Sequence, residues 1–168
     1  MRILAIDPGF ERIGIAIIEK SGSKKDTLVY SDCFKTKANL QFHERLTNIG
    51  IELERVIQKY TPEALAIEKL YFTTNQKTVM NVAEARGVML YTASKNGLLI
   101  FEYTPPQIKV AVTGYGKADK AMVMSMVPKL IYIDRKINSD DELDAIAIGL
   151  TCFAQERFST RGEVLQRK

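Results

Sequence analysis

The stretch ILAIDPG, residues 3–9, runs an apolar strand directly into a carboxylate and then into a Pro-Gly turn. A second stretch, EALAIEKLYF at residues 63–72, repeats the pattern, with four apolar residues followed by Glu68. In open α/β sheets the ligand crevice lies beyond the carboxyl ends of the parallel strands. We therefore expect Asp7 and Glu68 to lie close together at that edge.

Each of these carboxylates has an ordinary explanation when it is considered alone. Asp7 can simply form the turn before Pro-Gly, and Glu68 can be a solvated strand end. Two unpaired carboxylates that are brought together repel each other, however, and raise each other's pKa unless a cation lies between them. Because Mg²⁺ prefers carboxylate oxygens, the pair predicts a divalent metal site.

The stretch INSDDELDAIAIGL, residues 137–150, offers further acids at the start of a predicted helix. Ser139 and Glu142 match an S-x-x-E capping box, which places Asp140 and Asp141 in the first helical turn. Acids there favour the helix dipole, and Asp140 need have no other role.

Asp144 is harder to explain as a dipole partner, because it lies beyond the first turn and precedes an apolar stretch that should pack against the sheet. Asp141 and Asp144 are three residues apart and therefore share a helix face. Two metal ions about 4 Å apart, the arrangement used for phosphodiester hydrolysis, can be held by four carboxylates. The candidates are Asp7, Glu68, Asp141 and Asp144.

The remaining pattern predicts a mixed α/β fold, with an antiparallel meander followed by alternating helices and strands. Helices should cover both faces of the sheet, because the strands joined by helical crossovers must be parallel. The expected strands are 2–7, 13–20, 27–36, 64–68 and 98–103, and the expected helices are 39–60, 76–95, 105–112, 118–130 and 140–157.

Composition fits one cytoplasmic domain without a membrane span. The chain has 168 residues and a net charge of +4, which weakly favours an anionic partner such as nucleic acid. No apolar run approaches the roughly 18 residues that a membrane helix needs. Cys33 and Cys152 are too few for a disulfide framework or a zinc site, and buried thiols are expected.

An ordered set of motifs then covers residues 3 to about 155: IDPG, AIEK, EARGV, EYTPPQIK, GYGKADK and DELDAIAIG. This set resembles the RuvC family of bacterial Holliday-junction resolvases, in the RNase H-like nuclease superfamily. The resemblance implies an RNase H-like fold with a five-stranded mixed sheet of order 3-2-1-4-5. It also implies a homodimer that makes paired symmetric nicks in a four-way DNA junction, in recombination and DNA repair.

The same resemblance implies two Mg²⁺ ions in each active site, with Mn²⁺ able to substitute. The family's four catalytic, metal-binding acids fall on Asp7, Glu68, Asp141 and Asp144. The branch-migration proteins RuvA and RuvB would be partners. We expect a resolvase domain at residues 1–158, and the polar stretch STRGEVLQRK predicts a flexible tail at 159–168.

Five further residues are candidates for DNA contact. Tyr71 and Phe72 follow Glu68 closely, and one of them can stack on an unpaired base while the other forms a hydrophobic lid on the next helix. Lys117 and Lys120 flank a helix start, where a bound phosphate would favour them, although surface lysines are usually only solvated. By resemblance, Tyr71 matches the family's stacking aromatic, and Lys109 and Lys120 match basic residues near the active site.

The helix predicted at residues 76–95 is apolar on both sides, which indicates burial on both sides. It can be a central helix, or a two-fold partner can cover its second side. The resemblance favours the dimer.

Three other functions remain open at this point. The stretch DPGFERIGIAI also resembles the YqgF proteins, RuvC-like nucleases linked to ribosomal RNA processing, although EARGV, GYGKADK and the chain length favour the resolvase. An actin-like ATPase or sugar kinase would need a second domain and a nucleotide-binding glycine segment. A module that binds junctions without cutting them would not need all four acids.

Overall fold

The computed structural model describes residues 1–22, 25–70 and 76–156, which form one mixed sheet covered by helices. The strand order is β3-β2-β1-β4-β5, as the resemblance implies. The strands β1, β2 and β3 form an antiparallel meander, and β1, β4 and β5 are parallel. Their bounds are β1 Arg2–Asp7, β2 Arg12–Glu19, β3 Thr27–Lys35, β4 Ala64–Glu68 and β5 Leu99–Tyr103.

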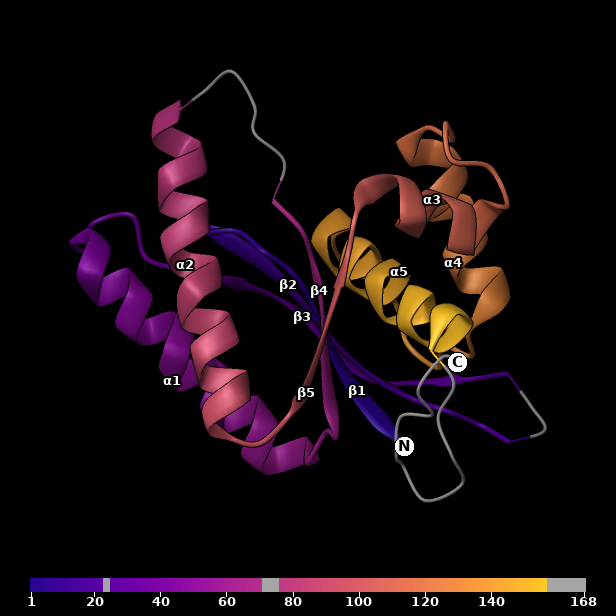
Figure 1. Ribbon diagram of the computed structural model, residues 1–168, viewed down its shortest axis with the longest axis horizontal. Coiled ribbons are helices and arrows are strands. Elements are labelled where there is room, and N and C mark those ends of the chain that lie inside the picture. The colour runs from indigo at the N-terminus through magenta and orange to yellow at the C-terminus, as the bar shows by residue number, and fades with distance from the viewer. Residues whose placement is uncertain (23–24, 71–75, 157–168) are drawn as a thin grey trace, which may run out of the picture.

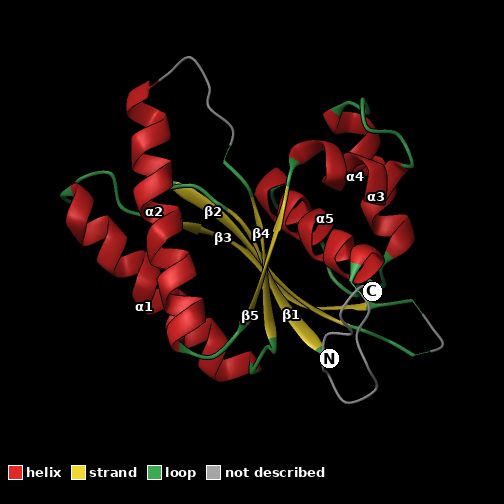
Figure 2. Cartoon of the chain, in the orientation of Figure 1, coloured by secondary structure: helices red, strands yellow, loops and turns green. Residues whose placement is uncertain are grey.

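Helices cover both faces of this sheet, as expected. Figures 1 and 2 show α1 and α2 on one face and α3, α4 and α5 on the other, with the twisted sheet between them. The bounds are α1 Phe42–Tyr60, α2 Gln76–Lys95, α3 Pro105–Thr113, α4 Lys120–Leu130 and α5 Asp140–Gln155. No helix within the described ranges is long and apolar enough to cross a membrane.

The alternation of side chains along the strands explains which acids meet. In β1, Leu4 and Ile6 pack toward α1 and α2, whereas Ile3 and Ala5 pack toward α5. Since alternate residues of a strand face the same side, Asp7 also faces α5. The same count along β4, where Ala64 and Ala66 face α5, places Glu68 on that side.

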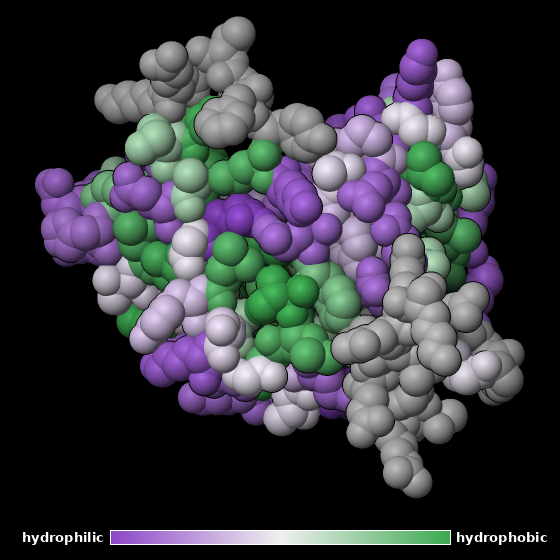
Figure 3. Space-filling model, viewed as in Figure 1, coloured by the Kyte–Doolittle hydropathy of each residue, from purple (hydrophilic) through white to green (hydrophobic). Residues whose placement is uncertain are grey.

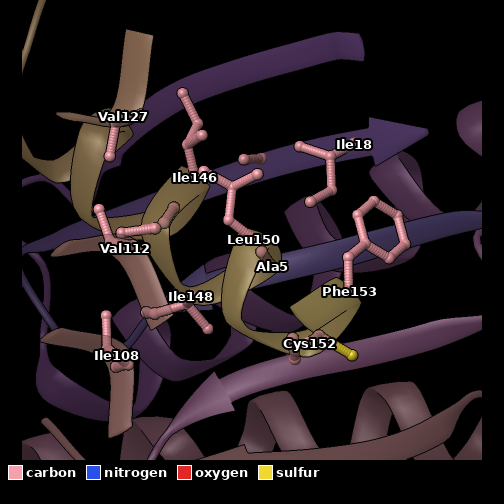
Figure 4. Packing of buried hydrophobic residues seen from close by; sticks show 14 of the residues in the cluster. Ala5, Ile18, Ile108, Val112, Val127, Ile146, Ile148, Leu150, Cys152 and Phe153 are labelled. Carbon is pink, nitrogen blue, oxygen red and sulfur yellow. The ribbon is translucent and has the colours of Figure 1, made fainter. Parts of the chain in front are cut away.

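The helix α5 is the central helix of the fold. Its residues from Ala145 to Phe153 are all buried, because the sheet lies on one side and α3 and α4 lie on the other. Figure 4 shows its side chains leaving the helix in several directions, among them Ile148, Leu150 and Phe153. Gly149 brings the helix close to the sheet, since a Cβ there would lie 2.5 Å from Ile18 Cδ1.

The helix α2 is therefore not the central helix of the fold, and of the two arrangements predicted for it, the one in which it is central was wrong. Ala85, Met89 and Ala93 are buried against the sheet side, but Met80 and Tyr91 are exposed on the opposite side. The described part of the chain leaves this second apolar side uncovered.

Three predicted helix ends were wrong by two or three residues. The helix α1 begins at Phe42 rather than 39, because Gln41 and Glu44 form a capping box. The helix α4 begins at Lys120 rather than 118, because Asp119 caps it by accepting a hydrogen bond from the Met122 amide. The helix α5 ends at Gln155, since Glu156 is extended. The proposed domain end at 158 and the tail at 159–168 lie outside the described residues.

Gly14 lets the first turn of α5 approach the sheet. It pairs with Asp7 on β1 and with Cys33 on β3, directly under the start of that helix. A Cβ at this position would lie 2.0 Å from the backbone oxygen of Asp141 and 3.1 Å from Cβ of Asp7. Backbone cannot move aside as a side-chain tip can, so only glycine fits here.

We predict that Gly14→Ala lowers the free energy of unfolding by about 2 kcal/mol or more, because the added methyl group overpacks against backbone. Gly87→Ala is the matched control. Its Cβ would meet nothing within 4 Å, and alanine in a helix interior is favoured by up to about 1 kcal/mol. Urea unfolding of both variants checks this. Equal stabilities would show that α5 can shift freely over β2.

Candidate active site

A cavity of about 240 Å³ lies at the carboxyl ends of β1 and β4, beside α5. Asp7, Glu68 and Asp144 line it together with Lys109 and Lys120. Its remaining wall is mainly apolar and comes from α3, α4 and α5, through Pro105, Ile108, Val123, Ala147 and Ile148. Three of the four predicted acids therefore share one cavity with two of the predicted lysines.

Asp7 and Glu68 are strongly perturbed acids. Burial, followed by repulsion from Asp144, Glu68 and Asp141, raises the pKa of Asp7 to about 7. Burial, followed by repulsion from Asp144, raises the pKa of Glu68 to about 7. Neither carboxylate has a hydrogen-bond or ion-pair partner within the described ranges. Lys120 lowers the pKa of Asp7 only in part, because its ion pairs are with Asp140 and Asp144.

Asp144 has a cation of its own. Lys120 Nζ lies 3.1 Å from Asp144 Oδ2 and 3.6 Å from Asp140 Oδ2. Burial raises the pKa of Asp144, and the hydrogen bond from Lys120 opposes that shift. Lys120 therefore reaches from the first residue of α4 across to the first turns of α5.

Asp141, the fourth predicted acid, does not line the cavity. Its Oδ2 accepts a hydrogen bond from Arg12 Nε at 3.1 Å and another from Arg12 Nη2. Cys33 Sγ donates to the same oxygen at 3.3 Å. The hydrogen bond from Arg12 is the main reason that the pKa of Asp141 is lowered.

Sequence reasoning missed Arg12 and Cys33 as neighbours of the site. Cys33 was expected to be a buried thiol, but it is only half-buried, whereas Cys152 is fully buried. Gly14 lies on the face of β2 that is turned toward α5. Arg12, two residues earlier in β2, lies on the same face, and Cys33 pairs with Gly14 across β2 and β3. Both side chains therefore reach Asp141 at the start of α5. These contacts depend on which residues of β2 and β3 pair with each other, and residue spacing alone does not predict that pairing.

Glu142 was predicted only as a capping residue, and that interpretation was incomplete. Ser139 does cap α5, with its Oγ accepting from the Glu142 amide at 3.3 Å. The buried Glu142 carboxylate, however, accepts from the Asn138 amide at 3.0 Å and from Ser31 Oγ at 2.6 Å. Arg135 also reaches it, at 3.4 Å. Glu142 therefore fastens α5 to β3 and takes no part in the cavity.

The candidate DNA contacts divide into three groups. Lys109 and Lys120 line the cavity, whereas Lys117 is exposed and does not line it. Tyr71 and Phe72 lie outside the described residues. Their predicted roles in stacking therefore stay predictions.

The chain is similar to proteins of one family over most of its length. The family profile described as crossover junction endodeoxyribonuclease RuvC matches residues 3–152. The protein of that name from Ruminiclostridium cellulolyticum is 41% identical over 150 residues, which cover 89% of this chain and 90% of that protein. Its counterpart from Thermosipho melanesiensis is 39% identical over 158 residues, covering 94% and 100% of the two chains.

Solved structures give the same result. RuvC of T. thermophilus in complex with a Holliday junction substrate superposes with a TM-score of 0.85 at 29% identity, covering 92% of this chain and 93% of that one. The yeast mitochondrial Holliday junction resolvase Ydc2 shares the fold, with a TM-score of 0.65 at 14% identity, covering 89% and 76%. The predicted RNase H-like fold is thus confirmed.

A matched profile over nearly the whole chain, close relatives and a superposable fold agree with the cluster of acids at the strand ends. The chain therefore belongs to the RuvC family of crossover junction endodeoxyribonucleases.

Proposed function

We propose that this protein resolves four-way DNA junctions by paired symmetric nicks, in recombination and DNA repair. The observation that carries the proposal is the convergence of Asp7, Glu68 and Asp144 on one cavity at the strand ends. A relative of 29% identity has been solved with a Holliday junction substrate, which supports a junction as the substrate here.

The residues of the cavity fit a divalent metal ion. Carboxylate oxygens are the ligands that Mg²⁺ prefers, and within the described ranges the side chains of Asp7 and Glu68 form no ion pair, although Lys120 acts on Asp7 from a distance. Burial first, and repulsion from neighbouring acids second, raise the pKa values of both carboxyls, and a bound cation would favour their ionised forms. We propose that Asp7, Glu68, Asp141 and Asp144 hold two Mg²⁺ ions, with Mn²⁺ able to substitute.

When bound, the metal would supply a nucleophilic water at neutral pH and stabilise charge on the leaving oxygen. The protein's own residues do the remaining work. Ile108, Val123 and Ile148 give the cavity an apolar wall, which strengthens the electrostatic interactions inside it. Lys120 and Lys109 place two cations at the rim for the phosphates that flank the scissile bond.

Other contacts with DNA belong to the same proposal. Lys117, which is exposed beside α4, would neutralise a phosphate farther from the cavity. Tyr71, or else Phe72, would stack on a base that is unpaired at the junction centre. These contacts supply affinity and orientation rather than chemistry.

We further propose a homodimer, because two nicks in opposed strands need two sites. The strand β5 is the edge of the sheet, and its Leu99 and Ile100 are exposed. Figure 3 shows apolar side chains gathered where β5 crosses this face. Met80 and Tyr91 are exposed apolar residues on the neighbouring helix α2. A two-fold partner that covers α2 and the edge of β5 would bury both, and RuvA and RuvB are the proposed further partners.

The direct test is cleavage of a labelled four-way junction in Mg²⁺. We expect symmetric nicks in two opposed strands that a ligase can reseal, and no cutting in chelator. Linear duplex of the same sequence and single-stranded RNA are the control substrates. Equal cutting of the RNA would favour the YqgF-like function, and binding without cutting would favour a recognition module.

The acids have a more specific test. Asp7→Asn should abolish nicking but leave junction binding intact, because phosphate and shape contacts supply affinity independently of the metal chemistry. In metal-free buffer at pH 8 the variant should also be more stable than the wild type by about 2 kcal/mol or more, at about 1.4 kcal/mol per pKa unit. The gain arises because the neutral amide avoids a buried, repelled charge.

The pH dependence of that gain has a definite sign. The pKa of Asp7 is raised from 3.8 to about 7 on folding, so the wild type is penalised progressively as pH rises through this window. The stability difference should therefore be small at pH 4 and full above pH 7, as measured by urea unfolding. Asp140→Asn, which removes an exposed acid at the start of α5, is the control. A less stable Asp7→Asn protein would mean that Asp7 is a structural residue.

A further inference from the structure

One arginine binds a proposed metal ligand that does not line the cavity shared by the other three. Arg12, the first residue of β2, donates to Asp141 Oδ2 from Nε at 3.1 Å and also from Nη2. Cys33 Sγ donates to the same oxygen at 3.3 Å. Three donors thus converge on one carboxylate oxygen, and Asp141 lies on the Arg12 side of α5 instead of lining the cavity.

The four acids are not gathered around a single point in this structure. In residues 1–22, 25–70 and 76–156, no three carboxylate, thiol or imidazole side chains lie close enough together to hold one metal ion. Asp7, Glu68 and Asp144 line the cavity, but the acid that would complete the set is engaged elsewhere. The side chain that holds it is a cation, and so competes for the same oxygen that a metal would use.

We propose that Arg12 is a positioning residue that competes with the metal for Asp141, and so sets the metal concentration at which the active site assembles. The inference rests on the proposed function, since it requires Asp141 to be a ligand. In the metal-free protein Arg12 serves as the counter-ion of Asp141. Loading the site exchanges that guanidinium for the metal.

The two cations beside the acids differ in what they do. Lys120 pairs with Asp144 while that carboxylate remains in the cavity, so this pair neutralises charge without removing a ligand. Arg12 pairs with Asp141 outside the cavity. A guanidinium stays protonated throughout the working pH range, so the competition is always present. Cys33 is a weak, neutral donor and adds less.

The exchange is physically easy for Arg12. Its side chain is 51% exposed, whereas that of Asp141 is 21% exposed. A half-exposed guanidinium that leaves its partner is rehydrated at once, and exposed ion pairs of this kind contribute little to stability. Losing the pair should therefore change metal affinity without unfolding the protein.

The test is Mn²⁺ binding to the full chain without DNA, measured from the electron paramagnetic resonance signal of the free ion. Arg12→Gln should bind Mn²⁺ about fivefold more tightly than the wild type, the change expected on removing an exposed competing ion pair. Arg12→Lys, which retains the charge but loses the two-pronged contact, should lie between the two.

Arg55→Gln is the matched control. Arg55 is 49% exposed and pairs with Glu52 on α1, with Nε at 2.8 Å from Oε2, so the variant removes an equally exposed ion pair and the same net charge. We expect its Mn²⁺ affinity to equal that of the wild type. This control separates the local competition from the general effect of removing one positive charge.

A double variant shows whether Arg12 acts through Asp141. In an Asp141→Asn background, Arg12→Gln should bring no further change in Mn²⁺ affinity. The inference is overturned if Arg12→Gln binds Mn²⁺ no more tightly than Arg55→Gln, or if its effect survives in Asp141→Asn. If Arg12→Gln has no specific effect on Mn²⁺ affinity but the wild type binds Mn²⁺ and cuts junctions, only the role of Arg12 is refuted. If the wild type does not cut junctions, the proposed function itself is refuted.

Discussion

The repulsion among carboxylates gathered at the ends of two parallel strands is the constraint on which the rest of the site depends. Asp7 and Glu68 follow fully buried strands and face α5 because the two-residue alternation leaves no other side for them. Burial and like charge together raise both pKa values to about 7. An acid pair of this kind opposes folding at neutral pH, so the surrounding structure must hold it in place.

The central helix provides that support. Buried from Ala145 to Phe153, α5 contacts the sheet, α3 and α4, and its apolar packing offsets the cost of its acidic first turns. Gly14 and Gly149 allow it to lie close to β2, while Glu142 fastens it to Ser31 on β3. In the first turns of α5, Arg12 pairs with Asp141 and Lys120 pairs with Asp144. The packing of α5 against the sheet therefore holds together carboxylates that repel each other.

Much of this arrangement is predictable from local pattern. The strand bounds, the sheet order and the acids Asp7, Glu68 and Asp144 follow from apolar runs that end in carboxylates and from the ordered family motifs. Helix starts were less predictable, because Gln41 is an uncommon cap. The contacts of Arg12 and Cys33 with Asp141 depend on the register of two hairpins and on the depth to which α5 settles. These are properties of long-range packing, which residue spacing does not encode.

If the acids need a cation to be ionised together, metal binding must release protons from them. Calorimetric titration of Mg²⁺ into the DNA-free protein, repeated in buffers of different ionisation enthalpy, counts the protons displaced. With Asp7 and Glu68 titrating at about 7, binding at pH 6 should release about one proton or more, and binding at pH 9 almost none. Release of no protons at either pH would mean that both carboxylates are already ionised without the metal, and that they need no cation.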